Sequence, residues 1–196
     1  MIDEFLSNPS PDSTVAFFYC NRAEESRRDP QNILNALVQQ LSLGSGDELM
    51  KPVIDVYNER ERIGQTCSPL SFAESRQLLI QLTDLCPQTT ICLDALDEIE
   101  DVRRVIILST LREVATKSGS LVRIFATTRM DPQILSQLEE FPKILLQPDD
   151  NSHDIIRFVE ERLESAIEED QLLLGSVPEE LKTEIRDTLC TRSKGM

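Results

Sequence analysis

Apolar and polar positions follow two different periods along the chain. Short, nearly continuous apolar runs, typical of strands buried on both faces, occur at four places. They are residues 14–20 (TVAFFYC), 89–98 (TTICLDALDE, ending in acids), 121–129 (LVRIFATTR) and 143–147 (KILLQ). Between these runs, apolar residues recur three and four positions apart, which predicts helices. Strands alternating with helices predict an α/β domain whose mostly parallel sheet is built by right-handed crossovers and covered on both faces.

Five predicted helix starts carry a capping signal, which is an Asp-Pro pair, an S-x-x-E box or a single acid. They are Asp29-Pro30, Ser71 with Glu74, Asp101, Asp131-Pro132, and Ser176 with Glu179. The helix expected after Asp101 carries Val102, Val105, Ile106, Ser109 and Leu111 and ends near Gly119. Beyond residue 150 the strand signals cease, and two amphipathic helices are predicted.

Composition excludes several classes of function. The formal charge is −15 at pH 7, which argues against nucleic acid and anionic membrane surfaces, since both are bound by Lys and Arg. No apolar run approaches the roughly 20 residues of a membrane span. The five cysteines are odd in number and form no C-x-x-C pair, so we expect free thiols, no disulfide framework, and a cytoplasmic (intracellular) location.

Candidate chemistry gathers where two predicted strands end. Asp94 closes an apolar run, and Asp97 and Glu98 follow within one turn. Thr127, Thr128 and Arg129 end the next strand. Ligands of open α/β sheets bind beyond the carboxyl ends of the strands, so these side chains are expected on one rim.

This pattern has the form of a Walker B element. Asp94 can hold Mg²⁺ through its water shell, and Asp97 or Glu98 can orient the attacking water. Arg129 can read a γ-phosphate, with the two threonines hydrogen-bonding nearby. The plainer alternative is that the later acids only favour the N-terminus of the following helix. That alternative does not explain Asp94, which is costly to bury without a role.

A phosphate-binding loop has no counterpart in the sequence. Such a loop reads G-x-x-x-x-G-K-[ST], because its backbone amides, Lys and hydroxyl surround the phosphates. None of the six glycines is followed by Lys, and Gly44 and Gly46 lead into Asp47 and Glu48, which would repel phosphate.

Several stretches together resemble the NACHT domain of fungal STAND P-loop NTPases, the group with nephrocystin-3-like N-terminal domains found in heterokaryon-incompatibility-type proteins. They are STVAFFYCNRAEESRRDPQNILNALVQQLS, PQTTICLDALDEIED, LVRIFATTR and DNSHDIIRFVEERL. The resemblance implies a P-loop NTPase-like, three-layer α/β/α fold that binds Mg²⁺ and ATP or GTP. It matches Asp94, Asp97 and Glu98 to the Walker B acids and Arg129 to the sensor arginine.

The chain departs from that family at both ends. We expect residues 1–12 to be the remnant of the helix after the Walker A loop, 13–150 an incomplete NACHT core lacking its first strand, and 151–196 the start of the helical region. Strand 89–94 is then expected between strands 14–20 and 121–126. The edge of the 121–126 strand is expected to be unpaired unless strand 143–147 fills the gap, which predicts marginal stability.

Three functions follow from these expectations. The first is a regulatory NTPase switch that cannot by itself bind or hydrolyse ATP, so that Mg²⁺ and nucleotide bind weakly or not at all. Its implied partners are other NACHT-type chains or the rest of a longer repeat-containing protein, without nucleic acid or membrane. The second is a catalytically silent interaction module, and the third is a non-functional fragment. ATP cannot be distinguished from GTP at this level.

Overall fold

The computed structural model describes residues 13–43, 48–172 and 176–193. The expected helix remnant at residues 1–12 and the glycines Gly44 and Gly46 lie outside these ranges. The chain divides into two compact units, Met1–Glu139 and Glu140–Met196, and each is described by itself.

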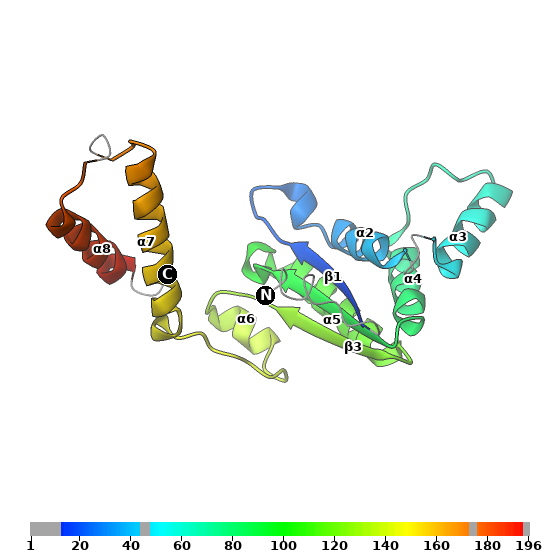
Figure 1. Cartoon of the computed structure of the whole chain (residues 1–196). Helices are drawn as coiled ribbons and strands as arrows, with labels where there is room; N and C mark the ends of the chain where they lie inside the picture. Colours follow the sequence, from blue (N-terminus) through cyan, green and yellow to red (C-terminus); the bar gives the residue numbers. More distant parts are fainter. Residues whose placement is uncertain (1–12, 44–47, 173–175, 194–196) are drawn as a thin grey trace. The chain divides into compact units, whose positions relative to one another are not determined.

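A three-stranded parallel sheet forms the centre of the first unit (Figure 1). Its strands are β1 (Ser13–Tyr19), β2 (Gln88–Asp94) and β3 (Leu121–Ala126), in the order β1-β2-β3. Tyr19 pairs with Asp94, and Leu93 pairs with Ala126, so the carboxyl ends of the strands meet at one rim. The predicted central position of β2 is confirmed, and five consecutive residues of this strand are buried.

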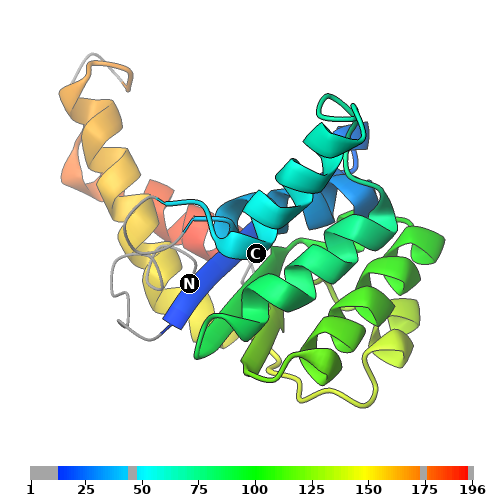
Figure 2. The same cartoon turned by 90° about the vertical axis from the view of Figure 1, so that its right-hand side faces the viewer.

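Three helices pack against one another as a layer over one face of the sheet. They are α2 (Pro30–Leu41), α4 (Phe72–Asp84) and α5 (Asp101–Lys117). Figure 2 shows α4 and α5 side by side in the first unit. Leucines and isoleucines from α2, α4 and β2 interlock in the core, among them Ile33, Leu37, Leu79, Leu82 and Ile91. The chain thus has a mixed α/β fold, consistent with the P-loop-type α/β class.

Capping explains where these helices start. Asp29 accepts hydrogen bonds from two backbone N–H groups of α2, and Pro30 is the first helical residue. Ser71 and Glu74 form the reciprocal capping box of α4. Asp131 caps the short α6 (Pro132–Gln137) in the same way as Asp29 caps α2. These three predictions are confirmed.

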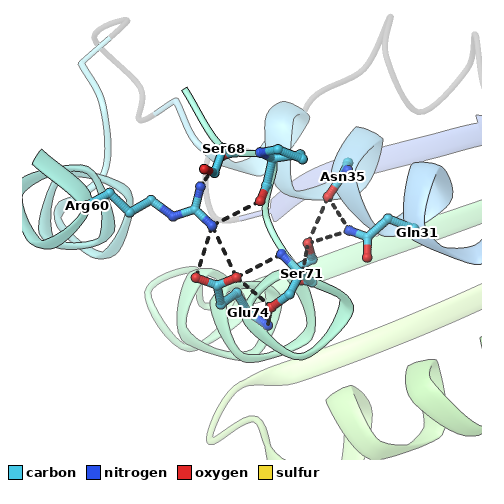
Figure 3. A network of polar contacts seen from close by, with 8 residues as sticks. Gln31, Asn35, Arg60, Ser68, Ser71 and Glu74 are labelled. Atoms are coloured by element: carbon cyan, nitrogen blue, oxygen red, sulfur yellow. Dashed lines mark hydrogen bonds and ion pairs between the residues drawn. The ribbon is translucent and has the colours of Figure 1, made fainter. Parts of the chain in front are cut away.

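Helix α3 (Lys51–Arg62) contains no fully buried residue; Val53 and Val56 pack against the edge of the core, and Arg60 adds polar contacts. Figure 3 shows Arg60 of α3 reaching Ser68, Glu74 and the start of α4. Its Nη2 donates to Pro69 O at 3.1 Å and to both Glu74 carboxylate oxygens at 3.0 and 3.1 Å. One side chain therefore ties α3, the following loop and the α4 cap together.

The free backbone edges of the two outer strands, β1 and β3, differ in whether a side chain pairs with them. On β1, the Gln40 side chain accepts from Phe17 N–H at 2.9 Å and donates to Phe17 O at 2.8 Å. The amide thereby satisfies backbone groups that a further strand would otherwise pair. Among the described residues β3 pairs with β2 only, and Leu121 on it is 50% exposed.

The predicted cap of α5 is wrong, although the helix carries the apolar residues expected of it. Its N-cap is Glu100, which makes no side-chain cap hydrogen bond, and Asp101 is the first helical residue. The buried face of α5 includes Ile107, Leu111 and Val114, whereas Val102 is 75% exposed. Apolar residues lie on more than one side of α5, so periodicity alone could not choose the side that packs.

Residues 143–147 were expected to form a strand, and this prediction is wrong as well. They are irregular, and Ile144 is 86% exposed. An apolar run becomes a strand only where a neighbouring strand takes its backbone hydrogen bonds, and the only ladders among the described residues are β1–β2 and β2–β3.

The second unit contains a short 3-10 turn, η3 (Pro148–Asn151), and two helices that pack against each other, α7 (Ser152–Glu168) and α8 (Glu179–Ser193). The start of α7 agrees with the prediction. The capping box of Ser176 with Glu179 is wrong, because α8 begins at Glu179 itself, which places Ser176 outside the capping position. No described helix of either unit is long and apolar enough to cross a membrane.

Candidate functional site

The site lies on the rim where the three strands end. Hydrogen bonding between strands continues past their last residues, since Cys20 N–H donates to Asp94 O at 3.0 Å and Thr127 N–H donates to Leu93 O at 2.9 Å. Leu96 N–H then donates to Thr127 O at 2.8 Å. The turn that follows β2 is therefore fixed to both neighbouring strands.

Asp94 and Thr127 are joined directly across this rim. The Thr127 hydroxyl donates to Asp94 Oδ1 at 2.6 Å and accepts from Ala95 N–H at 2.9 Å. A hydroxyl donor to an ionised carboxylate is a strong hydrogen bond, so it fixes the carboxylate orientation. The half-buried Asp94 thus has a polar partner, as a carboxylate in an apolar strand requires.

Ala95 bends the chain sharply so that the next acids come forward. It has left-handed backbone angles, φ 56° and ψ 53°, which cost a residue with a side chain roughly 1–2 kcal/mol. The turn leads into a single 3-10 turn, η2 (Leu96–Glu98). Leu96 is buried there and anchors the turn, while Asp97 and Glu98 reach the rim as partly buried carboxylates.

Arg129 faces these two acids. Its Nε lies 3.4 Å from Asp97 Oδ2, and its Nη2 lies 3.7 Å from Glu98 Oε1. Its backbone N–H also donates to Asp97 Oδ1 at 3.2 Å. The Arg129 side chain is 83% exposed, so an anion approaching the rim has access to it. The structure therefore places Arg129 beside the acids to which sequence analysis assigned it.

Thr128 does not join the cluster. Its hydroxyl donates to the carbonyl of the adjacent Arg129 at 3.2 Å, a local contact that involves no acid. Of the two predicted threonines, Thr127 therefore contacts Asp94, whereas the hydroxyl of Thr128 makes only a local hydrogen bond.

A third group of contacts at the rim, which was not predicted from the sequence, comes from Arg22 in the loop after β1. Arg22 Nη2 donates to Asp97 O at 2.8 Å, and Arg22 N–H donates to Glu98 Oε2 at 3.2 Å. The Arg22 Nε lies 4.0 Å from the same carboxylate oxygen. Its position three residues beyond the end of β1 could have predicted the contact, because the carboxyl ends of parallel strands meet at one rim.

Negative charge dominates the electrostatics behind the rim. The pKa of the Cys20 thiol is raised from 9.0 to about 12, first by burial and then by the charges of Asp94, Asp97 and Glu98. The thiol is therefore protonated and unreactive at neutral pH. Cys20 and Cys92 are both buried, which confirms that they act as small core residues.

The oxygen ligands of the rim suit a Mg²⁺ ion that keeps most of its water. Among the described residues, no three His, Cys, Asp or Glu side chains are arranged to enclose a metal ion. Mg²⁺ retains much of its water and is held by one or two carboxylates together with substrate phosphates. Asp94 meets that need with the oxygen that Thr127 does not occupy, so the residues fit a water-shelled ion and do not fit a protein cage.

A comparison with protein-family models identifies the relationship. The model described as Nephrocystin 3, N-terminal matches residues 1–129. The chain belongs to this nephrocystin 3 N-terminal family. The match extends from the first residue to Arg129, so it includes every candidate residue of the rim. Searches of curated proteins and of solved structures give no match.

Proposed function

We propose that this nephrocystin-3-type domain supplies the Walker B and sensor half of a NACHT-type, nucleotide-dependent switch in a STAND signalling protein. The Asp94–Thr127 hydrogen bond at the end of the central strand carries the proposal. It turns one carboxylate toward the rim where ligands of parallel sheets bind. Asp94 would hold the water shell of Mg²⁺, Asp97 or Glu98 would orient the attacking water, and Arg129 would contact the transferred phosphate.

The phosphate-binding half of the site would come from elsewhere. None of the six glycines precedes a lysine in this sequence, and the loop amides and lysine supply most of the phosphate affinity in such sites. We therefore propose that these residues bind Mg²⁺ weakly, and nucleotide weakly or not at all. Another NACHT-type chain, or the remainder of a longer repeat-containing protein, would complete the site for ATP or GTP.

The metal half can be tested on the chain as it exists. Mn²⁺ replaces Mg²⁺ at oxygen sites and broadens the NMR signals of nearby nuclei. In a titration of the ¹⁵N-labelled chain, the amides of Ala95, Asp97 and Arg129 should broaden before the rest. Asp94→Asn should abolish this preference, because it removes the charge and leaves the shape.

Asp101→Asn is the matched control, since Asp101 lies at the exposed start of α5 and has the same chemistry. It should leave the order of broadening unchanged. Uniform broadening over all acidic surfaces in the wild-type chain would contradict the proposal. Micromolar ATP-Mg²⁺ binding measured by calorimetry and lost in Asp94→Asn would keep the switch and reject the silent-module alternative.

A catalytically silent interaction module is the second candidate. It is favoured by the pairing of Asp97 and Glu98 with arginines and by the exposed apolar Leu121 on the β3 edge. In that case the rim acids would serve only to hold the turn, and the Mn²⁺ titration would show no preferred site.

A further inference from the structure

The two helices of the second unit have almost no core of their own. Helices α7 and α8 pack against each other (Figure 1), and Arg186 of α8 lies 3.5 Å from the Glu160 carboxylate of α7. Among the described residues of these two helices, only Leu163 of α7 is buried. Isolated helices of this length are marginal in water, because most of their stability comes from packing an apolar face. The α7–α8 pair therefore needs a further surface to cover its apolar face.

An apolar groove of about 870 Å³ lies along the two helices. Phe158 in its lining is 62% exposed and Leu189 is 49% exposed. The apolar lining residues are Ile155, Phe158, Val159, Leu163 and Ala166 of α7 and Leu189 of α8. On α7 they recur three and four positions apart, so they form one stripe along the helix. An exposed apolar stripe beside charged residues is typical of a protein-binding surface.

Two charged residues of α7 also line the groove, Asp154 and Arg162. The Arg162 guanidinium lies over the ring of Phe158, with Cζ 6.0 Å from the ring centroid. Within the described part of the chain, neither Asp154 nor Arg162 forms a salt bridge. The neighbouring Arg157, by contrast, pairs with Glu161 on the same helix at 2.9 Å. The charges that face the groove are therefore available to a partner.

The spacing of these two charges makes the groove complementary to itself. Asp154 lies four residues before Phe158, and Arg162 lies four residues after it. When two α7 helices lie antiparallel about a twofold axis at Phe158, residues equally far from Phe158 come opposite one another. Asp154 of each copy then faces Arg162 of the other. The two Phe158 rings meet at the axis, where an aromatic pair adds to the apolar contact.

The charge of the rest of the chain also favours this face for association. The formal charge is −15, so two copies repel each other in most orientations. Inside the groove, Arg162 and Arg192 outnumber the single acid, Asp154. Arg192 lies in the last turn of α8, where the helix dipole favours a positive charge. Repulsion between copies is thus weakest where the apolar stripe is exposed.

We propose that two copies of this chain associate through their α7–α8 grooves, with the α7 helices antiparallel and Asp154 of each copy paired with Arg162 of the other. The product is a four-helix arrangement in which each apolar stripe covers its counterpart, as in helix bundles. This interface belongs to the second unit and is independent of the nucleotide site proposed above.

Charge reversal in the full chain tests the pairing. Asp154→Arg and Arg162→Asp each place like charges opposite one another twice in the dimer. Each should raise the dimer dissociation constant, measured by sedimentation equilibrium, roughly tenfold or more. The two substitutions change the net charge in opposite directions, so a general effect of charge would move the constant in opposite directions.

Rescue of the dimer is the sharper readout. An equimolar mixture of the two variants should associate again, because every pair across the twofold axis then joins opposite charges. The double variant, Asp154→Arg with Arg162→Asp, should associate for the same reason. Recovery in either sample also shows that the single variants are folded. Failure of both samples to recover would overturn the proposal.

Arg157→Asp is the matched control for Arg162→Asp. Arg157 lies on the same helix and its substitution changes the charge equally, but its salt bridge lies within α7. The dissociation constant should stay within about twofold of the wild type. Association through the β3 edge is common to all these proteins, so only the differences among them are informative. Equal effects of the Arg157 and Arg162 variants would overturn the interface. A wild-type chain that stays monomeric at its highest soluble concentration would overturn it too, and protection of the α7 amides from hydrogen exchange in that monomer would assign the groove to another segment of the same chain.

Discussion

The Thr127 hydroxyl lies between Asp94 Oδ1, to which it donates at 2.6 Å, and the backbone N–H of Ala95, from which it accepts at 2.9 Å. One side chain, directly after β3, thus fixes both the last carboxylate of β2 and the first residue of the turn after it. Rigid support of this kind is what a binding carboxylate needs, because a site loses affinity when its ligands must first be ordered.

Thr127→Val should therefore destabilise the first unit. The substitution keeps the shape of the side chain but leaves Asp94 and Ala95 N–H without this partner, at a cost of about 1–3 kcal/mol. Urea unfolding followed by circular dichroism measures the change.

Thr128→Val is its control, because the Thr128 hydroxyl donates to the adjacent Arg129 carbonyl, a local and exposed hydrogen bond. It should stay within about 0.5 kcal/mol of the wild type. An equal loss of unfolding free energy in the two variants would show that the hydrogen bond to Asp94 contributes no more to stability than the local bond of Thr128.

The left-handed turn at Ala95 yields a second prediction. Ala95→Gly removes the strain at φ 56° but increases the entropy of the unfolded chain, so the stability change should stay within about 1 kcal/mol. Ala95→Val places a β-branched residue in a conformation that such residues rarely adopt.

Ala95→Val should therefore unfold at a clearly lower urea midpoint than Ala95→Gly. With Gly, Ala or Val at position 95, the expected order of the urea midpoints is Gly ≥ Ala > Val. A Val variant as stable as the wild type would mean that the turn relaxes when its sequence changes.

The α4 cap predicts a pH dependence. Hydrogen bonds from Ser71 and the pairing with Arg60 lower the pKa of Glu74 from 4.5 to about 2 (Figure 3). Because the folded pKa lies below the unfolded value, this group stabilises the fold above pH 4.5. The contribution is lost as the pH falls from about 4.5 towards 2.

Glu74→Gln should remove this contribution at pH 7 and make the protein less sensitive to acid in that window. Unfolding midpoints of both proteins at pH 7 and pH 3 test it, and the difference between them should shrink at pH 3. Glu61→Gln is a suitable control, because Glu61 is an exposed acid of α3 and should change neither midpoint appreciably. A difference independent of pH would show that the charge of Glu74 is not involved.

Local chemistry made much of the fold predictable. Asp29-Pro30 and the Ser71–Glu74 box act through neighbouring backbone groups, so sequence alone locates those helix starts. The apolar run before Asp94 had to be a central strand, because only such a strand is buried on both faces. These local rules also placed the carboxylate and Arg129 at one rim.

The wrong or missing predictions concern residues whose contacts are distant in the sequence. Residues 143–147 have the composition of a strand, but a strand exists only with a neighbour to pair with. The apolar residues of α5 offer more than one face, and only the packing of α2 and α4 selects the one that includes Ile107. Arg22 was missed because its partners are 75 and 76 residues away in the sequence.

The edges of the sheet yield the last prediction. On β1 the Gln40 amide occupies the backbone of Phe17, whereas β3 is the opposite edge strand and carries the half-exposed Leu121. Unprotected edges with apolar side chains promote association, and lysine on an edge opposes it. Leu121→Lys should therefore reduce self-association, measured by sedimentation velocity over a range of concentrations.

Tyr57→Lys provides the control for this substitution. Tyr57 is exposed to a similar extent, 55%, but lies on α3 away from any strand, and the change in net charge is the same. If charge alone governed association, the two lysine variants would behave alike. If the edge governs it, only Leu121→Lys shifts the protein towards monomer. A wild-type chain that sediments as a single monomer and melts cooperatively would contradict the prediction, and it would show that the β3 edge is protected in solution.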